Sequence, residues 1–372
     1  MSKKARIAVI GTGWWSTYAH IPTLKNYPDV EVVALADVRP DVLAKAADYY
    51  DVEKTYTDYR ELLADESLDG VVVAVWHAAH YEVAQACLEH DLHVVLEKPM
   101  VLKASDARDL IDMARARDLE IVMSYPWNYL PAARRARDVL GSGELGAIHF
   151  ISNVFSSNPM NLFRGNDGSD DIEMTNQYPV VGPGDVYSDP ERSGGGQGHL
   201  QVTHSAGMMF FVTGLRPTSV IAQMNNLDVA VDVVDAMIVR MDNGCLASVG
   251  STGATFGGDG KLDIQVYCEN GWVDLDIMTA SGKIYYADGR IEDLSNNDGD
   301  ADPDQPGSDA PGAGAAYPAH LPAENLADII LKKSENRSSG EIGWRTVELL
   351  DAAYRSAARN GEAVSVASLY EG

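Results

Sequence analysis

The feature that most constrains the fold of this chain is a short apolar run, Ile7–Ile10, that ends in the glycine turn Gly11-Thr12-Gly13. A pattern typical of a helix follows at Ser16–Tyr27, and a second apolar run, Val30–Ala36, stops at Asp37. Short apolar runs bounded by glycine are typical of strands that are buried on both faces of a parallel sheet. The start of the chain therefore predicts one strand–helix–strand unit.

The same alternation of apolar runs and helical patterns continues as far as Ser124. Further strands are expected at Gly70–Val75, His93–Leu96 and Glu120–Met123, and further helices at Pro40–Tyr50, Arg60–Ala64, Tyr81–His90 and Ser105–Asp118. Strands and helices that alternate in this way predict a doubly wound parallel sheet, the Rossmann architecture. We assign residues 1–124 to this dinucleotide-binding domain.

Longer strands dominate from residue 125 to residue 372, and two Asn-Gly turns predict hairpins. Strands are expected at Ala147–Phe155, Val233–Met241, Cys245–Ser251, Lys261–Cys268 and Gly271–Ile277, and helices at Pro131–Leu140, Pro322–Lys332 and Ile342–Arg359. This pattern predicts a second α/β domain. Its large, open sheet should be mainly antiparallel, with the terminal helices packing back.

Two long segments fit no regular structure. Residues 156–198 are rich in Asn, Asp, Gly and Pro, and residues 294–314 are acidic and rich in Gly and Pro. Loops of this length are usually functional or disordered. We expect the first segment to form part of a substrate pocket and the second to be a mobile surface loop.

The charge and the cysteines exclude several classes of function. The formal net charge is -26, which repels phosphate backbones and anionic lipid head groups, so neither nucleic acid nor a membrane is an expected partner. Cys87, Cys245 and Cys268 are too scattered for a disulfide framework, which fits a reducing cytoplasm. His77 and His80 have ligand-like spacing, but no cysteine or carboxylate cluster joins them, so no metal is expected.

Gly11 and Gly13 follow a strand and open a helix, where free N–H groups can hold a pyrophosphate. Ser16 replaces the third glycine of this fingerprint. Asp37 ends the next strand, about 20 residues on, where a carboxylate hydrogen-bonds ribose hydroxyls. Such a carboxylate favours NAD over NADP, although Arg39 is near enough to weaken the preference. The alternative for Asp37 is a helix N-cap or a surface carboxylate.

The triplet Glu97-Lys98-Pro99 directly follows an expected strand. With this triplet the chain resembles the Gfo/Idh/MocA oxidoreductases, in which a Glu-Lys-Pro triplet closes the dinucleotide domain and its lysine faces both nicotinamide and substrate. The resemblance extends over nearly the whole chain, through the segments His20-Ile21-Pro22, Ala36-Asp37, His80, Gly194-Gly195-Gly196 before His204, Pro322-Ala323-Glu324-Asn325 and Asp351-Ala352-Ala353-Tyr354-Arg355-Ser356.

The resemblance implies that Lys98 and His204 are catalytic. Burial beside an oxidised nicotinamide lowers the pKa of a lysine toward the range in which it relays a proton, and Glu97 could orient Lys98. An imidazole at His204 could exchange a proton with a substrate hydroxyl. The cofactor contacts expected are Gly11, Thr12, Gly13, Trp14, Trp15, Asp37, Val38, Arg39, Val75, Trp76, His77, His80, Glu97 and Lys98.

The expected substrate is a sugar, a polyol or a glycoside. Tryptophan faces stack on the apolar faces of sugar rings, and Trp14, Trp15, Trp76 and Trp127 all fall in expected loops or turns, although ordinary packing is the alternative. No cluster of basic residues stands in the predicted pocket loops, and Arg164 and Arg192 are the main candidates there for recognising an anionic group. The substrate contacts expected are Lys98, Tyr125, Trp127, Asn128, His199, Gln201 and His204.

Three positions depart from the family pattern. Leu200 stands where the family commonly has Asp, four residues before the active-site histidine, and Gly207 stands where an Asp often follows it. Val75-Trp76-His77 replaces the usual Thr-Pro-Asn at a strand end. The proton relay is therefore expected to be altered, with Lys98, Gln201 or His199 compensating.

Three hypotheses for function follow. The first is reversible hydride transfer between NAD(P) and a secondary alcohol or ketone of a sugar, inositol or glycoside. The second is a lyase or glycoside-cleaving reaction in which bound NAD oxidises a ring carbon transiently, with no net redox change. The third is a non-catalytic dinucleotide-binding sensor. The resemblance also implies that residues 125–372 bind the substrate and mediate oligomerisation, as a homodimer or homotetramer.

Overall fold

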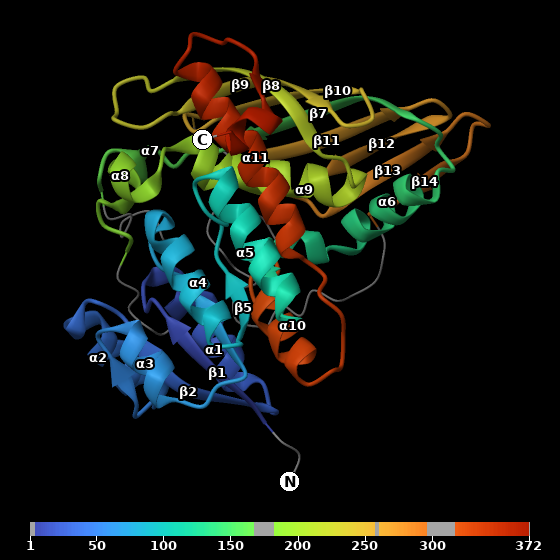
Figure 1. Ribbon diagram of the computed structural model, residues 1–372. Helices are drawn as coiled ribbons and strands as arrows, with labels where there is room; N and C mark the ends of the chain where they lie inside the picture. Colours follow the sequence, from blue (N-terminus) through green and yellow to red (C-terminus); the bar gives the residue numbers. More distant parts are fainter. Residues whose placement is uncertain (1–3, 167–181, 257–259, 296–316, 372) are drawn as a thin grey trace.

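The computed structural model describes residues 4–166, 182–256, 260–295 and 317–371. These residues form two sheets at opposite ends of the molecule, with helices packed between and around them (Figure 1). The chain builds one sheet first and the other second. Two helices near the C-terminus then return to the first sheet and to the region between the sheets.

The N-terminal sheet has six parallel strands in the order β3-β2-β1-β4-β5-β6. The winding direction reverses between β1 and β4, as in a doubly wound sheet, so the predicted Rossmann architecture is confirmed. The strands are β1 (Ala5–Ile10), β2 (Val30–Ala36), β3 (Thr55–Tyr56), β4 (Gly70–Val73), β5 (His93–Leu96) and β6 (Ile121–Met123).

Both faces of this sheet are covered by helices. Ile7 and Val9 of β1 pack with α1, α2 and α10 on one face, whereas Ala8 and Ile10 pack with α3, α4 and α5 on the other. Because neither face meets water, the strand is uninterruptedly apolar from Ile7 to Ile10. The helices are α1 (Ile21–Asn26), α2 (Pro40–Tyr50), α3 (Tyr59–Asp65), α4 (His80–Glu89), α5 (Ala104–Ala116) and α10 (Leu321–Ile330).

The second sheet has nine strands in the order β14-β13-β12-β11-β7-β10-β9-β8-β15. Its neighbouring strands are antiparallel except for β7 and β10, which are parallel, so the expected mainly antiparallel open sheet is confirmed. The strands are β7 (Ile148–Ser156), β8 (Pro217–Asn225), β9 (Val234–Met241), β10 (Leu246–Thr252), β11 (Lys261–Cys268), β12 (Gly271–Asp276), β13 (Ser281–Tyr286), β14 (Ile291–Asp293) and β15 (Val364–Ser365).

Helices cover one face of the second sheet and leave the other face exposed. Along β9 the side chains alternate between buried and exposed positions, as expected for a sheet covered on one face only. Helices α6, α9 and α11 contact the covered face. The helices of this part are α6 (Pro131–Ser142), α7 (Met160–Phe163), α8 (Pro190–Ser193), α9 (Thr203–Thr213) and α11 (Gly340–Ala357).

The structure departs from the sequence expectations in several elements. The helix expected at Ser16–Tyr27 begins as a π-helical turn, η1 (Ser16–His20), before α1. Strands β8, β13 and β14 were not expected, and β3 and β15 have only two residues each, too few to show a pattern. Of the two loops expected to be irregular, residues 167–181 and 296–314 lie outside the described residues, whereas 156–166 and 182–198 include α7 and α8.

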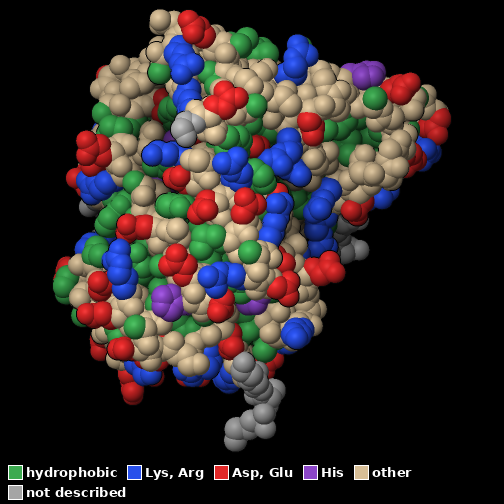
Figure 2. Space-filling model, in the orientation of Figure 1, with side chains coloured by type: hydrophobic (Ala, Val, Ile, Leu, Met, Phe, Trp, Pro, Cys, Tyr) green, Lys and Arg blue, Asp and Glu red, His purple; other side chains and the backbone are tan. Residues whose placement is uncertain are grey.

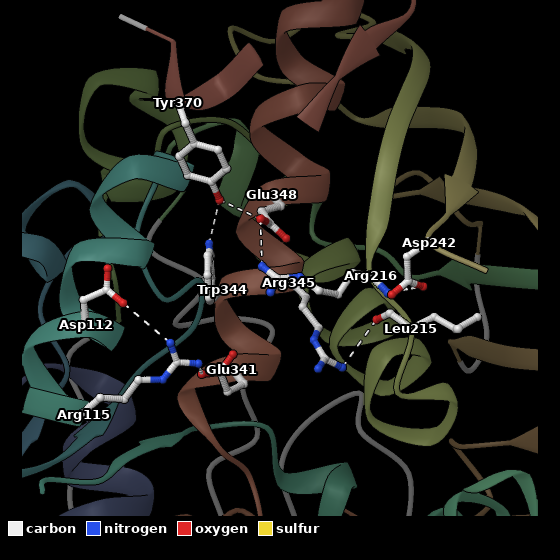
Figure 3. Close-up of polar contacts among 10 residues, drawn as sticks. All are labelled: Asp112, Arg115, Leu215, Arg216, Asp242, Glu341, Trp344, Arg345, Glu348 and Tyr370. Atoms are coloured by element: carbon white, nitrogen blue, oxygen red, sulfur yellow. Dashed lines mark hydrogen bonds and ion pairs between the residues drawn. The ribbon is translucent and has the colours of Figure 1, made fainter. Parts of the chain in front are cut away.

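Helix α11 connects the two sheets through a polar network (Figure 3). The hydroxyl of Tyr370, near the C-terminus, donates to Glu348 of α11 at 2.6 Å, and Arg216, which precedes β8, pairs with the same carboxylate at 2.9 Å. At the first turn of α11, Glu341 pairs with Arg115 of α5. One rigid helix therefore contacts elements of both sheets and helps to fix their relative orientation.

Charged side chains of both signs are interspersed on the surface. On the face shown in Figure 2, Lys and Arg side chains stand among Asp and Glu side chains over both halves of the molecule. Within the described part of the chain, no helix is both long and apolar enough to cross a bilayer. Cys87, Cys245 and Cys268 are all free thiols.

Candidate active site

Lys98 stands directly after β5, and its neighbours are held by buried hydrogen bonds. Nε2 of His20, at the end of η1, donates to Oε1 of Glu97 at 2.7 Å. Burial raises the pKa of Glu97, but the hydrogen bond and the charge of His20 outweigh burial and the pKa is lowered. Glu97 is thus an anion fixed behind Lys98, and the peptide bond between Lys98 and Pro99 is cis.

Two histidines brace the backbone around this lysine. The ring nitrogens of His80 lie 2.7 Å from the carbonyl oxygen of Pro99 and 3.1 Å from that of Val75. Nδ1 of His77 lies 2.8 Å from the carbonyl oxygen of Ser193. His80 therefore links the turn after β5 to the end of β4, and His77 links the end of β4 to α8.

The side chain of Lys98 reaches across to the second half of the chain. Its Nζ donates to the carbonyl oxygen of Leu200 at 3.1 Å. Desolvation by the surrounding protein lowers the pKa of Lys98 to about 8, although the negative charge of Glu97 opposes the shift. Near neutral pH this amine therefore exists in both protonation states and can accept or release a proton.

His204 lies one turn beyond Leu200, at the start of α9, and is buried. Burial lowers the pKa of His204 well below its usual value, and the positive charge of Lys98 lowers it further. The Nδ1 atom is buried and has no hydrogen-bond partner among the residues that the structure describes. Lys98 and His204 are therefore two titratable groups in one environment, and His204 has a free nitrogen.

Aromatic rings link the N-terminal glycine turn to His204. Trp15 packs edge-on against Tyr317 at a centroid distance of 5.9 Å, and Tyr317 packs against Trp127 at 4.8 Å. Trp127 in turn lies 5.3 Å from the ring of His204. Trp14 contacts Trp15 at 5.3 Å. The rings of Trp14, Trp15, Trp127 and Tyr317 with His204, which we call the aromatic wall, bring elements from distant parts of the sequence together.

Two indole N–H groups of the aromatic wall are left without partners. Nε1 of Trp15 and Nε1 of Trp127 are buried and have no hydrogen-bond partner among the described residues. A buried donor without a partner costs free energy, so such atoms are rare in folded proteins unless a ligand or a water satisfies them. With Nδ1 of His204, they are three polar atoms that a hydroxylated ligand could satisfy.

The end of β1 is built for close approach of a ligand to the backbone. Gly11 has φ +93°, and a Cβ at this position would lie 2.2 Å from the carbonyl oxygen of Ala74, so only glycine is tolerated. The backbone N–H of Thr12 donates to Oδ2 of Asp37 at 2.8 Å. Gly11 and Asp37 follow β1 and β2, at the carboxyl edge of the sheet where doubly wound proteins bind dinucleotides.

Asp37 is held by two different kinds of donor. Arg39 pairs with it in a bidentate manner, with Nε and Nη2 each 3.0 Å from a carboxylate oxygen. Burial raises the pKa of Asp37, but the hydrogen bonds and charge of Arg39 outweigh burial, so its pKa is lowered. An ionised carboxylate at this edge fits the ribose hydroxyls of a dinucleotide, and the glycine turn fits its pyrophosphate. Of the other expected contacts here, Val38 is exposed, and so is Trp76 after β4.

The Leu200 and Gly207 departures each have a packing explanation. The side chain of Leu200 lies in an apolar cluster with Met160, Phe163 and Val233, so this position offers the site a backbone carbonyl and no side-chain carboxylate. A Cβ on Gly207 would lie 3.0 Å from the ring of Tyr125. Tyr125 therefore occupies the space that a longer side chain at residue 207 needs.

Several residues expected to contact the substrate form hydrogen bonds or ring contacts within the protein instead. Nδ2 of Asn128 donates to the hydroxyl oxygen of Ser338 at 3.1 Å. The hydroxyl of Tyr125 lies 3.1 Å from that of Thr203, and the ring of Tyr125 lies 6.0 Å from the ring of His204. His199 stacks on Tyr354 at 4.6 Å, and burial lowers its pKa to about 4. Gln201 is half-buried. Compensation for Leu200 by Gln201 or His199 stays a prediction.

Sequence reasoning missed three residues of this region. His20, which holds Glu97, was expected only as part of a motif. The ring of Tyr187 packs against that of His77 at a centroid distance of 5.6 Å, and burial is the main cause that raises the pKa of Tyr187 to about 12. Tyr317 belongs to the aromatic wall. No apolar periodicity in the sequence around Tyr187 or Tyr317 marks either residue as buried. In the described ranges no three His, Cys, Asp or Glu residues gather as a metal-binding group.

Family models match both halves of the chain. The model of an oxidoreductase family with an NAD-binding Rossmann fold, GFO_IDH_MocA, matches residues 5–125. The model of the GFO/IDH/MocA C-terminal domain matches residues 133–274. The chain belongs to the Gfo/Idh/MocA oxidoreductase family. The expectation drawn from the Glu97-Lys98-Pro99 triplet is thus confirmed.

Relatives within this family act on different substrates. A D-xylose 1-dehydrogenase (NADP(+)) of Haloferax volcanii is 27% identical over 76% of this chain and 81% of that protein. A myo-inositol 2-dehydrogenase of Thermotoga maritima is 30% identical over 39% of this chain and 43% of that protein. An uncharacterised oxidoreductase of Synechocystis sp. is also matched over only 40% of its length. The matched regions thus include less than half of two of these relatives.

A solved structure shares the whole fold. Levoglucosan dehydrogenase in complex with NADH and levoglucosan superposes with a TM-score of 0.74, over 98% of this chain and all of that chain, at 18% identity. At this identity the likeness establishes the fold of both sheets. This oxidoreductase therefore has the fold of a known dehydrogenase, whereas its substrate has to be argued from its own residues.

The packing of Leu200 generates a prediction. Replacing Leu200 by Asp, the residue common in the family, should lower the free energy of unfolding by roughly 2–4 kcal/mol, because an unpaired carboxylate would enter an apolar cluster. Urea unfolding followed by circular dichroism measures this loss. Leu200→Met, which keeps the side chain apolar, is the control and should stay within about 1.5 kcal/mol of the original. Unchanged stability in Leu200→Asp would show that the side chain does not occupy the cluster.

Proposed function

We propose that this oxidoreductase is an NAD-dependent dehydrogenase of an uncharged sugar, inositol or glycoside, which oxidises a secondary alcohol to a ketone reversibly. The observation that carries the proposal is a set of three buried polar atoms in the aromatic wall that have no partner among the described residues: Nε1 of Trp15, Nε1 of Trp127 and Nδ1 of His204. His204 is also close enough to Lys98 for the lysine charge to lower its pKa. An aromatic surface that also offers hydrogen-bonding groups suits a ring with hydroxyl groups.

Lys98 and His204 would handle the proton of the reacting hydroxyl. With a pKa of about 8, Lys98 is partly neutral and can accept that proton, while its contact with the Leu200 carbonyl holds Nζ in place. The lowered pKa of His204 keeps its imidazole neutral, so Nδ1 can accept or donate a hydrogen bond, according to its tautomer. Glu97 stabilises the protonated form of Lys98 after transfer.

The residues that would hold the cofactor lie at the carboxyl edge of the Rossmann sheet. The glycine turn, Gly11 to Gly13, would receive the pyrophosphate, and Asp37 would bind the adenosine ribose. A bound nicotinamide supplies the acceptor or the donor of the hydride. Trp14 and Trp15, next to the glycine turn, would separate the reacting carbon from solvent.

The proposal of an uncharged substrate is supported by the ion pairs of two arginines in the segments expected to form the pocket. Arg164 pairs with Asp228 at 3.1 Å, and Arg192 pairs with Asp185 at 2.8 Å and with Asp189 at 2.7 Å. These arginines are the main basic candidates for recognising an anion, and each is already neutralised by carboxylates. A phosphorylated sugar would have to displace one of these pairs.

The exposed face of the nine-stranded sheet supports a homodimer as the assembly. Phe150, Tyr267, Trp272 and Tyr285 stand opposite one another on β7, β11, β12 and β13, and the last three rings stack at centroid distances of 5.5 and 4.3 Å. On β9 of the same sheet, two strands from β7, Ile238 is 51% exposed. An apolar sheet face of this kind can pack on a second copy of itself, sheet against sheet.

The function is tested by offering NAD and a panel of monosaccharides, inositols and glycosides to the purified protein while absorbance at the NADH band is recorded. We expect NADH to accumulate with one uncharged substrate and the reverse reaction to consume it. Product formation without NADH would instead support the transient-oxidation reaction, which the Leu200 replacement motivated. NAD binding without turnover of any compound would support the sensor.

Replacing Lys98 by Met should reduce kcat by at least about 1,000-fold while NAD binding is kept, because the proton acceptor is lost. In the unaltered enzyme kcat/KM for alcohol oxidation should rise with pH and level off above about pH 8, since the neutral amine is the active form. Lys103→Met removes a nearby exposed lysine and should change neither property. Full activity of Lys98→Met would exclude the assigned role.

The preference for NAD can be tested at Asp37. In Asp37→Ser the ratio of kcat/KM for NAD to that for NADP should fall by about tenfold or more, because the carboxylate is lost and Arg39 becomes free to pair with a 2'-phosphate. Asp41→Ser, which removes an exposed carboxylate near Arg39, is the matched control and should leave the ratio close to its original value. An unaltered ratio in Asp37→Ser would contradict the preference.

The assembly is tested by light scattering after size-exclusion chromatography. We expect a dimer for the unaltered protein, and monomers for Trp272→Lys and Ile238→Lys, because each places a charge on the exposed sheet face. Tyr49→Lys, on α2 of the other sheet, should stay dimeric. Circular dichroism distinguishes dissociation from unfolding. A dimer that survives both sheet substitutions would place the interface elsewhere, and a tetramer would require a second one.

A further inference from the structure

The helix that carries His204 begins with an irregular turn. The π-helical turn η5 (Gly198–Val202) continues directly into α9, and the carbonyl oxygen of Leu200 that holds Lys98 belongs to this turn. The glycine segment Gly194–Gly198 leads into it. The position of η5 along and around its axis therefore decides where both the Leu200 carbonyl and the His204 ring lie.

Asp232, in the loop before β9, binds the start of this helix through three consecutive backbone N–H groups. Gly196 and Gly198 donate to its two carboxylate oxygens, each at 2.7 Å. Gln197 donates to its backbone carbonyl oxygen at 2.8 Å. The first N–H groups of a helix have no partners within the helix, so a carboxylate there acts as a cap and also complements the positive helix end. Asp232 supplies this cap from a distant part of the chain.

The fit between Asp232 and the glycine segment is close. A Cβ on Gly196 would lie 2.0 Å from the carbonyl oxygen of Asp232. Cβ atoms on Gly195 and Gly198 would lie 2.2 and 2.6 Å from the hydroxyl oxygen of Tyr354. The three glycines are therefore required by contact with Asp232 and Tyr354, an explanation within the second half of the chain that needs no ligand.

Two further groups complete the surroundings of the Asp232 carboxylate. The hydroxyl of Tyr354, on α11, donates to its Oδ1 at 2.8 Å, and the same tyrosine ring stacks on His199 of η5. Asp235 is buried beside it, and burial, together with the negative charge of Asp232, raises the pKa of Asp235 well above its usual value. Its surroundings thus favour the neutral form of Asp235, whereas the side chain of Asp232 accepts hydrogen bonds from three donors.

We propose that Asp232 is a positioning residue for the reaction: its carboxylate fixes η5, and η5 sets the Leu200 carbonyl against Lys98 and His204 beside it. The inference rests on the proposed function for its kinetic consequence, but the contacts of Asp232 with Gly196, Gly198 and Tyr354 are independent of the substrate. Among the described residues, the hydrogen bonds of Asp232 go to Gly196, Gln197, Gly198 and Tyr354, and none of these is expected to bind the dinucleotide. Loss of Asp232 should therefore affect turnover and leave cofactor affinity in place.

The test compares two chemically identical substitutions in neighbouring positions. Asp232→Asn replaces one acceptor oxygen by an amide that cannot accept the N–H of Gly196 or Gly198, so kcat should fall by about 100-fold because the reacting groups are displaced. KM and Kd for NAD should change less than about twofold. Asp235→Asn puts a neutral amide where burial already favours a neutral carboxyl, and neither Asp235 oxygen has a hydrogen-bond partner among the described residues. This variant should therefore keep kcat within about threefold of the original.

Hydrogen exchange followed by mass spectrometry gives a readout that needs no substrate. Exchange of the amides in residues 196–204 should accelerate in Asp232→Asn and stay unchanged in Asp235→Asn. Peptides of the Rossmann sheet should exchange at the same rate in the unaltered protein and in both variants. If no compound is turned over, the proposed function fails, and hydrogen exchange still decides whether Asp232 holds η5. Faster exchange with undiminished kcat would overturn the positioning role, as would equal effects of the two substitutions.

Tyr354→Phe is a milder second variant that keeps the proposal testable if Asp232→Asn fails to fold. It removes one donor to Asp232 but keeps the ring that stacks on His199, so we expect a fall in kcat of about tenfold or less, with local acceleration of exchange in the same peptides. Thermal unfolding should remain cooperative. An original kcat and original exchange rates in Tyr354→Phe, combined with global unfolding of Asp232→Asn, would reduce Asp232 to a general stabilising residue and overturn the proposal.

Discussion

The amine of Lys98 lies between two sheets that are built from different parts of the chain. The chemistry available to the site depends on how far its surroundings stabilise the charged form of this amine. Desolvation disfavours the ammonium form, while Glu97 and the Leu200 carbonyl stabilise it. The balance leaves a pKa of about 8. A stronger partner, such as a second carboxylate in contact, would keep this lysine charged, and a wholly apolar setting would keep it neutral. Neither state alone could both accept and return a proton.

The two partners of Lys98 are held by the same structural device. Both helices that enter the site begin with a π-helical turn, η1 and η5, and such turns are frequent at functional sites. The first places His20 against Glu97, and the second places the Leu200 carbonyl against Nζ. Each turn is fixed from outside its own helix. The precision of the site thus depends on contacts between distant segments, including the return of α10 and α11 to the region of the first sheet.

The sequence was sufficient for features that a residue type marks locally. The apolar run of β1, the glycine turn and Asp37 showed a Rossmann sheet because each has a single physical reason to be there. It was not sufficient where the contribution comes from the backbone or from a long-range contact. No residue type marks the Leu200 carbonyl as the acceptor for Lys98. In the sequence Asp232 is indistinguishable from an ordinary loop carboxylate, and only the folded structure shows that it binds Gly196 and Gly198.

The leucine at residue 200 has a consequence for how protons can move. A backbone carbonyl accepts a hydrogen bond but does not take up a proton near neutral pH, so this position can hold Lys98 without joining a relay. An aspartate there could do both. Under the proposed function, proton exchange with the reacting hydroxyl would therefore rest on Lys98 and on His204, whose buried Nδ1 has no partner within the described structure. Because burial keeps His204 neutral, the lysine would be the group whose charge changes during turnover, and the pH dependence should follow its titration.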